Sequence, residues 1–407
     1  MREMKDSGVV WIGEIPQEWS LKRLRFLCNI TTGNMDTQDN DPEGQYPFYV
    51  RSPIVEHSNN YTFDNEAVLM AGDGVGAGKV FHYVNGKYGC HQRVYSMSDF
   101  NEVVGKYLYY YLQENFYKKI EESNAKSTVD SVRLPMLKDF PVVFPDVYQQ
   151  KEIVSYLNSK CANIDEVIKK QQTIIEKLKE YKLSFITSTV MGGLKTSVEM
   201  KSCGIGYWDK IPSNWRTMQI RHLFRLCDEK NYKPLEDVNL LSLYTDFGVF
   251  PHGEQEERGN KAVKAEGYKV VHTDDIVVNI ILAWMGAIGR SAYDGVTSPA
   301  YDIYRPVNGT CSRYYHYLFR TKLFSGECYK YGRGIMAMRW RTYSSEFKSI
   351  KVPVPSYTEQ VEIADYLDKR CAFIDKTIAD RNKAINKLED YKKSLIYEIV
   401  TGKREVL

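Results

Sequence analysis

An internal repeat constrains the fold of this chain more than any other feature of its sequence. Residues 355–407 begin PSYTEQVEIADYLDKRCAFID, and an earlier segment from residue 145 begins PDVYQQKEIVSYLNSKCANID. The two segments align without a gap at a shift of 210 residues, as between Cys161 and Cys371. The pattern Ile-Pro-x-x-Trp also recurs, at 15–19 and 211–215. The chain therefore consists of two copies of one module.

The repeated segments predict two long helices. Apolar residues recur at heptad spacing in both, as in a coiled coil, with polar interruptions at equivalent places (Lys182 and Lys392 among them). These shared interruptions favour two helices that pair antiparallel along their seams. The alternative is that each helix packs only against its own domain. The predicted helix-pairing residues are Leu157, Cys161, Ile164, Ile168, Ile175 and Leu178 in the first copy, and Leu367, Cys371, Ile374, Ile378, Ile385 and Leu388 in the second.

The front of each module has strand signals, because short runs of β-branched and aromatic residues are separated by Gly, Asn, Asp and Pro. The segments 104–122 and 312–331 are expected to be helical. We therefore predict an α+β (mixed α/β) fold, with two globular domains containing mixed β-sheets. Two long helices forming an antiparallel coiled coil would join them, with an internal pseudo-two-fold repeat. The predicted boundaries are 1–145 and 196–354 for the domains, and 146–195 and 355–407 for the helical spacers.

Composition excludes several classes of protein. The 407 residues are 43% hydrophobic and 26% charged, which is typical of a soluble multidomain chain. No apolar run reaches the roughly 18–20 residues that span a bilayer, and the N-terminal residues do not resemble a signal peptide. The eight cysteines are scattered without a C-x-x-C pair. This pattern indicates reduced thiols, a cytoplasmic location and no structural metal site.

The sequence contains no convincing catalytic motif. The run AGDGVGAGK at 71–79 resembles a phosphate-binding loop, but Asp73 stands where Gly is required and Val80 where Ser or Thr is required. We interpret it as a turn between strands, from which Lys79 could still face a phosphate. The tetrapeptides D-P-P-Y and N-P-P-Y of amino-methyltransferases do not occur, nor do G-x-S-x-G and H-E-x-x-H.

A basic and aromatic stretch precedes the second helical segment. Between residues 329 and 351 the chain reads YKYGRGIMAMRWRTYSSEFKSIK, with six basic residues and Glu346 as the single acidic one. The matching stretch of the first half is NAKSTVDSVRLPMLKDF at 124–140. Basic and hydroxyl side chains beside small residues suit contacts to phosphates and base edges. The alternative is a solvated basic loop, but the recurrence before both helices favours a DNA-binding role.

These residues resemble the DNA sequence-specificity subunits of type I restriction–modification enzymes, over essentially the whole chain. The resemblance is carried by a strand ending in Pro and a Glu-Gln-x-x-Ile-like segment that opens a long helix, at 352–375 and 142–165. The opening IPQEW and the closing IVTGK are also similar to this family. The first copy departs from the pattern at one position, where Gln149 replaces Glu.

The resemblance implies a non-catalytic subunit that binds double-stranded DNA. Two target-recognition domains would each read one half of a split, asymmetric site, and the helices would separate them and bind partners. Those partners would be two modification (methyltransferase) subunits and two ATP-driven restriction subunits. The assembled complex would be a type I site-specific deoxyribonuclease and adenine-N6 DNA methyltransferase. S-adenosylmethionine, ATP and Mg would bind the partners, and no cofactor would bind this chain.

Two other functions stay open: a coiled-coil protein-interaction scaffold without sequence-specific DNA binding, and a fused methyltransferase or nuclease. Because recognition domains vary within the family, local chemistry alone selects the candidate DNA contacts. They are Lys79, Gln92, Arg93, Lys126, Ser127, Thr128 and Arg133 in the first domain, and Arg290, Arg333, Arg339, Trp340, Arg341 and Tyr343 in the second.

Overall fold

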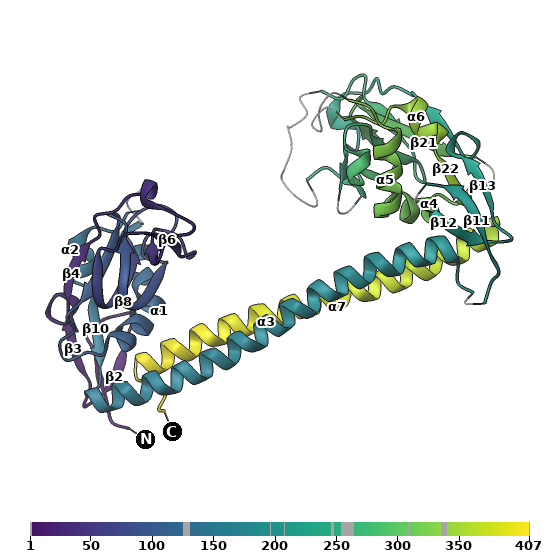
Figure 1. Cartoon of the computed structure of the whole chain (residues 1–407). Coiled ribbons are helices and arrows are strands. Elements are labelled where there is room, and N and C mark those ends of the chain that lie inside the picture. Colours follow the sequence, from purple (N-terminus) through teal and green to yellow (C-terminus); the bar gives the residue numbers. More distant parts are fainter. Residues whose placement is uncertain are drawn as a thin grey trace. The chain divides into compact units, whose positions relative to one another are not determined.

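The computed structural model divides the chain into two compact units. Unit 1 comprises Met1–Gln172 with Asn382–Leu407, and unit 2 comprises Thr173–Arg381. The division falls inside the long helices α3 (Val147–Gly192) and α7 (Tyr357–Val400), so each unit contains one globular domain and part of both helices (Figure 1). The structure describes residues 2–124, 131–195, 197–206, 208–245, 248–253, 264–307, 309–334 and 340–406, with the backbone alone at 119–124.

A six-stranded mixed sheet forms the centre of the first domain, in the order β4-β9-β7-β8-β5-β6. Its neighbours are antiparallel except for β5 and β8, which are parallel. The middle strand β7 is buried on both faces from Ala67 to Ala71, as its apolar sequence predicts. The sheet strands are β4 (Asn29–Thr32), β5 (Tyr46–Tyr49), β6 (Glu56–Ser58), β7 (Phe63–Ala71), β8 (Phe81–Cys90) and β9 (Val94–Ser98).

Helix α1 (Gly105–Asn124) packs against β7 and β8 and buries Tyr107, Tyr110 and Tyr111 in the main core of the domain. The short helix α2 (Leu134–Lys138) lies within the candidate basic stretch at 124–140. Two strand pairs and two 3-10 turns complete the domain: β1 (Met4–Asp6) with β2 (Glu14–Pro16), β3 (Ser20–Arg23) with β10 (Pro141–Phe144), η1 (Leu24–Phe26) and η2 (Thr37–Asp39).

The second domain contains a four-stranded antiparallel sheet in the order β14-β21-β18-β19. These strands are β14 (Phe224–Cys227), β18 (Ile276–Asn279), β19 (Ile288–Arg290) and β21 (Tyr301–Pro306). Four antiparallel pairs accompany it: β11 (Met200–Ile205) with β12 (Trp208–Pro212), β13 (Arg216–Gln219) with β22 (Lys351–Val354), β15 (Leu241–Tyr244) with β16 (Gly248–Pro251), and β17 (Lys269–Val271) with β20 (Gly295–Thr297).

The helical segment predicted at 312–331 is two helices, α4 (Ser312–Phe319) and α5 (Lys322–Tyr331). The break occurs because Thr321 caps α5, accepting a hydrogen bond on its side chain from the backbone N–H of Phe324. The remaining elements are α6 (Ser344–Ser349), η3 (Ile220–His222), η4 (Leu235–Asp237) and η5 (Ala283–Met285).

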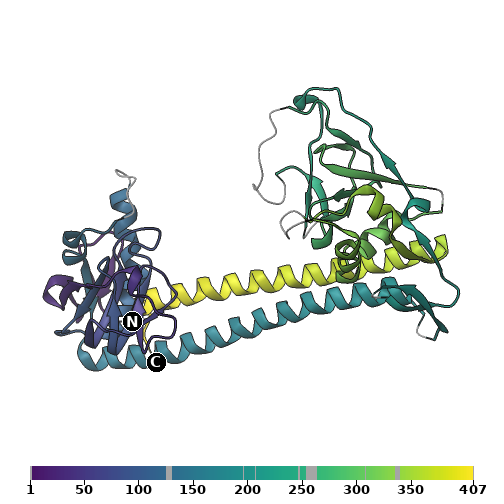
Figure 2. The same ribbon diagram turned by 45° about the horizontal axis from the view of Figure 1, so that its top comes forward.

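The two long helices pair antiparallel in each unit, as predicted (Figure 2). In unit 1, Lys392 Nζ lies 2.7 Å from a carboxylate oxygen of Asp165. In unit 2, Lys182 Nζ lies 2.6 Å from Asp375. The lysines that interrupt the two apolar seams therefore face a carboxylate on the other helix.

Each globular domain also receives the last turn of the helix that begins in the other unit. The Tyr107 hydroxyl donates to the Val400 carbonyl at 3.0 Å, and the Tyr314 hydroxyl donates to the Val190 carbonyl at 2.8 Å. Val190 and Val400 are 210 residues apart, so the two contacts are equivalent. The pseudo-symmetry inferred from the repeat therefore extends to the way in which the helices end.

The predicted seam residues lie on the inner faces of these helices to different depths. Ile164, Ile168, Leu178, Ile378 and Leu388 are half-buried. The fully buried ones are Leu157, Cys161, Ile175, Leu367, Cys371, Ile374 and Ile385. Within the described ranges, no helix is long and apolar enough to cross a bilayer.

Candidate nucleic-acid interface

Three segments of the first domain meet at one place: the β7–β8 turn, the β8–β9 turn and the segment that precedes α2. The Gly72 N–H donates to the Arg93 carbonyl at 2.9 Å, and the Val132 N–H donates to the Gly72 carbonyl at 2.8 Å. Asp73 and Ser131 form an isolated antiparallel bridge. The glycine-rich run is thus a turn between strands, as predicted. It brings the β8–β9 turn and the segment preceding α2 to one place.

Four candidate DNA contacts lie on these three segments: Lys79, Gln92, Arg93 and Arg133, all exposed. Arg93 Nε is 3.7 Å from Asp73, and the Gln92 amide donates to Asp36 at 3.0 Å. The other three candidates of this domain, Lys126, Ser127 and Thr128, lie outside the described residues.

Arg51 is a further cation of this surface that the sequence did not indicate. Its guanidinium lies 3.0 Å from Asp73, the carboxylate that also faces Arg93. Arg51 follows β5 and is some twenty residues from the turn in sequence, so only the fold brings it there. We call the four residues Arg51, Lys79, Arg93 and Arg133 the first basic surface.

The second domain has part of the same arrangement. The Thr342 N–H donates to the Ile280 carbonyl at 2.9 Å, which joins the segment preceding α6 to the end of β18. Arg333 and Arg341 pair through two backbone hydrogen bonds of 3.0 and 3.1 Å. Both side chains are exposed, and the Arg333 guanidinium lies over the Tyr343 ring and 2.8 Å from Glu346. Arg333, Arg341 and Tyr343 therefore form the second basic surface. Arg339 lies outside the described residues.

An aromatic stack borders the second basic surface. Trp340 stacks on Tyr329 with ring centroids 4.8 Å apart, and its indole N–H donates to the Tyr329 carbonyl at 3.0 Å. Tyr329 also contacts Trp284 edge-on. A shallow cavity of about 490 Å³ lies beside the stack, lined by Trp284, Met285, Lys322, Ser325, Gly326 and Tyr329. This candidate site thus combines cations with exposed aromatic surface.

Arg290 is positioned differently from the other candidates. Its guanidinium is ion-paired with Asp274 and only 24% of the side chain is exposed. Its backbone N–H donates to His316 Nδ1 at 3.1 Å. Burial lowers the pKa of His316 to about 3, so the ring is neutral and can accept this bond. Arg290 therefore holds β19 in place, with its charge already balanced.

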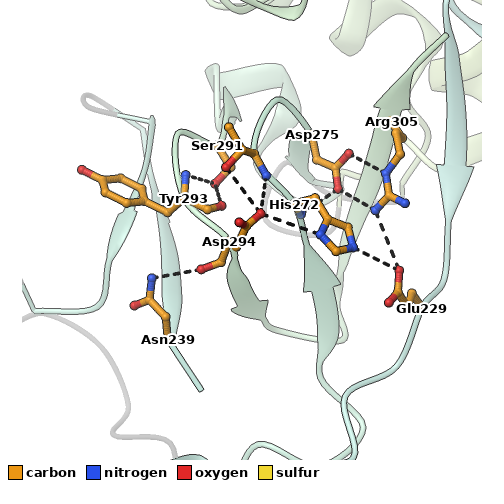
Figure 3. Close-up of polar contacts among 9 residues, drawn as sticks. Glu229, Asn239, His272, Asp275, Ser291, Tyr293, Asp294 and Arg305 are labelled. Atoms are coloured by element: carbon orange, nitrogen blue, oxygen red, sulfur yellow. Dashed lines mark hydrogen bonds and ion pairs between the residues drawn. The ribbon is translucent and has the colours of Figure 1, made fainter. Parts of the chain in front are cut away.

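A partly buried ion pair joins β21 to the residue that precedes β18 (Figure 3). Asp275, which is 1% exposed, accepts two hydrogen bonds of 3.0 Å from the Arg305 guanidinium. It also accepts one of 2.9 Å from the backbone N–H of His272. The His272 ring lies between Glu229 and Asp294, at 3.4 and 3.7 Å. These contacts hold the start of β18 against β21, at the end of the strand opposite to Ile280.

Among the residues that the structure describes, no group of three His, Cys, Asp or Glu side chains is arranged to hold a metal ion.

Comparison with known proteins identifies the family of the chain. Residues 16–183 and 212–389 match the family model of the type I restriction modification DNA specificity domain. The chain belongs to this family. Each matched range contains most of one globular domain and part of a long helix.

Curated specificity subunits align along nearly their whole length. The type I restriction enzyme EcoDI specificity subunit of Escherichia coli is 24% identical, over 96% of this chain and 89% of that protein. The MjaVIII specificity subunit of Methanocaldococcus jannaschii is 23% identical, over 96% of this chain and 94% of that protein.

Solved structures share the fold. A chain from a study of complex assembly and conformational transition in the type I R-M system aligns with a TM-score of 0.69 at 12% identity, covering 96% of this chain and 99% of that one. The HsdS subunit of Thermoanaerobacter tengcongensis aligns with a TM-score of 0.50 at 12% identity, covering 96% and 98%.

The Glu-Gln-x-x-Ile-like segment of this DNA specificity chain has a structural role. The Gln150 side chain accepts from the Val104 N–H at 2.7 Å and donates to the Pro145 carbonyl at 2.9 Å. Gln360 repeats this, accepting from the Cys311 N–H at 2.9 Å and donating to the carbonyl of the preceding proline. Each glutamine therefore ties the start of a long helix to the loop that precedes the main domain helix.

Gln149, which replaces Glu in the first copy, makes the same hydrogen bond as Glu359 makes in the second copy. Its side-chain oxygen accepts from the Trp19 indole N–H at 3.1 Å, and Glu359 accepts from the Trp215 indole N–H at 3.5 Å. An amide oxygen replaces a carboxylate oxygen as the acceptor, so the bond to the tryptophan is kept.

Proposed function

We propose that this chain is the DNA-reading subunit of a type I restriction–modification complex, with each globular domain reading one half of a bipartite, asymmetric sequence. One observation carries the proposal. Both domains join the turn after a central strand to the segment before a short helix by an equivalent backbone hydrogen bond, and both present exposed arginines there. Arginine suits this role because its guanidinium binds phosphates and the O6 and N7 atoms of guanine.

The mechanism is positional. The basic surfaces supply contacts to phosphates and bases, while α3 and α7 set the separation of the two half-sites. The base pairs between the half-sites are then read only as a length. Two modification subunits and two restriction subunits would bind the assembled chain and supply the chemistry, with S-adenosylmethionine, ATP and Mg. Because the net charge of the chain is only +3, we expect these partners to contribute much of the DNA clamp.

Mapping of methylated bases in a host that carries this chain with its modification partner tests the proposal. The expected result is a motif of two short blocks separated by an unread gap of fixed length. The double substitution Arg333→Ala with Arg341→Ala should alter or abolish one block and leave the other unchanged. Arg216→Ala, which removes an exposed arginine elsewhere in the second domain, is the matched control. A chain that supports no sequence-dependent methylation or binding would instead be a scaffold.

A further inference from the structure

An exposed apolar side chain projects from the first basic surface. Val75, at the turn between β7 and β8, is 92% exposed. It follows Gly74, whose φ of +72° favours glycine. Two residues later, buried Ala77 anchors the turn in the core. The turn therefore has a fixed base, and its apolar tip contributes nothing to the core.

The second domain also has an exposed apolar residue in the connection that follows its central strand β18. Met285, in the connection between β18 and β19, is 52% exposed and lies 210 residues after Val75. Both residues are followed by Gly-Ala, and both alanines are buried, at Ala77 and Ala287. Val75 contributes little to the core, and Met285 leaves about half of its side chain in solvent, so both turns offer apolar surface to a ligand.

At least one basic residue lies near each apolar side chain. The Arg51 guanidinium lies close to Gly74, and Lys79 ends the same turn. Met285 lines the shallow cavity together with Lys322 and Tyr329. An apolar point beside positive charge suits a ligand that carries an apolar group close to anions. In a DNA major groove, the thymine 5-methyl group lies between two phosphate backbones in this way.

We propose that Val75 and Met285 are specificity-determining residues, each packing on the 5-methyl group of a thymine in the half-site that its domain reads. This inference rests on the proposed function, because it requires that the basic surfaces bind DNA. It extends that function by assigning one apolar base contact to each domain.

Replacement of thymine by deoxyuridine tests the contact, because it removes only the methyl group. The full chain is assembled with its modification partner and titrated with duplexes that carry the mapped site, with one thymine replaced at a time. Loss of one buried methyl group should weaken binding about fourfold at one position in each half-site. Val75→Ala should abolish that dependence in the first domain's half-site alone, and Met285→Ala in the other half-site alone.

Matched controls use the same residue types at exposed positions away from the turns. Val10 is 100% exposed and Met200 is 42% exposed, so Val10→Ala and Met200→Ala should leave both uridine effects unchanged. Sequence-specific binding without a uridine effect, an effect that persists in the turn variants, or a half-site that lacks thymine would overturn the inference and leave the proposed function standing. Binding without sequence dependence would overturn the proposed function itself.

Discussion

Glu114 lies half-buried on α1, and its protonation couples the stability of unit 1 to pH. Burial raises the pKa of Glu114 to about 7 against an ordinary value of 4.5, although Lys118, Lys392 and Lys393 act in the opposite direction. The folded chain therefore binds a proton here that the unfolded chain releases. The resulting stabilisation is fully present below about pH 4.5 and is lost as the pH rises through 7.

Glu114→Gln should remove this dependence. The variant should match the parent chain near pH 5 and exceed its unfolding free energy by on the order of 1–2 kcal/mol at pH 8, because the neutral amide carries no charge to bury. Thermal or denaturant unfolding between pH 5 and 8 measures the difference. Glu176→Gln, at an exposed position of α3, should show no such trend. A difference for Glu114→Gln that stays constant over this range would contradict the assignment.

Asp275 supports the second domain through its buried carboxylate. Asp275→Ala should lower the unfolding free energy by about 2–4 kcal/mol, because the Arg305 guanidinium and the His272 N–H lose their acceptor in a buried place. Chemical denaturation measures the loss. Asp294→Ala removes a carboxylate of the same network whose side chain is 73% exposed, and should cost about 1 kcal/mol or less. Equal losses for the two variants would show that burial does not govern this network.

Sequence patterns predicted the elements of this fold better than they predicted its site. The heptad seam and the glycine-rich turn are local patterns, so α3, α7 and the β7–β8 turn could be inferred from spacing alone. The position of Arg51 could not be inferred from the sequence, because it lies beside Asp73 only through the order of the strands in the sheet. Arg290 looked like the other candidate arginines, and its pairing with Asp274 depends on a residue in a preceding turn. The roles of Gln150 and Gln360 likewise depend on backbone groups about fifty residues away.

Pairing of the long helices depends in part on two equivalent ion pairs. In unit 2, Lys182→Glu places a carboxylate opposite Asp375 and should lower the unfolding free energy by about 1 kcal/mol, since the pair is partly exposed. Adding Asp375→Lys should restore most of the loss, because the exchanged charges attract again. A double-mutant cycle in a denaturation assay measures the coupling.

The repeat supplies an internal control for that cycle. Lys392→Glu with Asp165→Lys tests the equivalent pair in unit 1, and the two cycles should give similar coupling energies. A double variant of either pair that is no more stable than its single variants would show that the lysines do not act through these carboxylates.

At the scale of the whole molecule, the proposed function assigns the separation of the two half-sites to the paired helices. An insertion into α3 alone would shift Lys182 and Asp375 out of register. An insertion of equal length at opposite points of the two helices keeps both ion pairs in register. At the spacing that the two ion pairs define, residues up to Gln172 lie opposite residues from Ile385 onward. One heptad added between Gln172 and Thr173, and one between Ala384 and Ile385, lengthens both helices equally.

Seven residues rise by about 10 Å along a helix, and base pairs rise by about 3.4 Å, so the unread gap in the DNA motif should grow by about three base pairs. Both half-sites should stay as they were, because neither basic surface is changed. Mapping of methylated bases with the lengthened chain and its modification partner measures gap and half-sites together. An unchanged gap would show that something other than the helices sets the spacing, and altered half-sites would show that the helices also shape the reading surfaces.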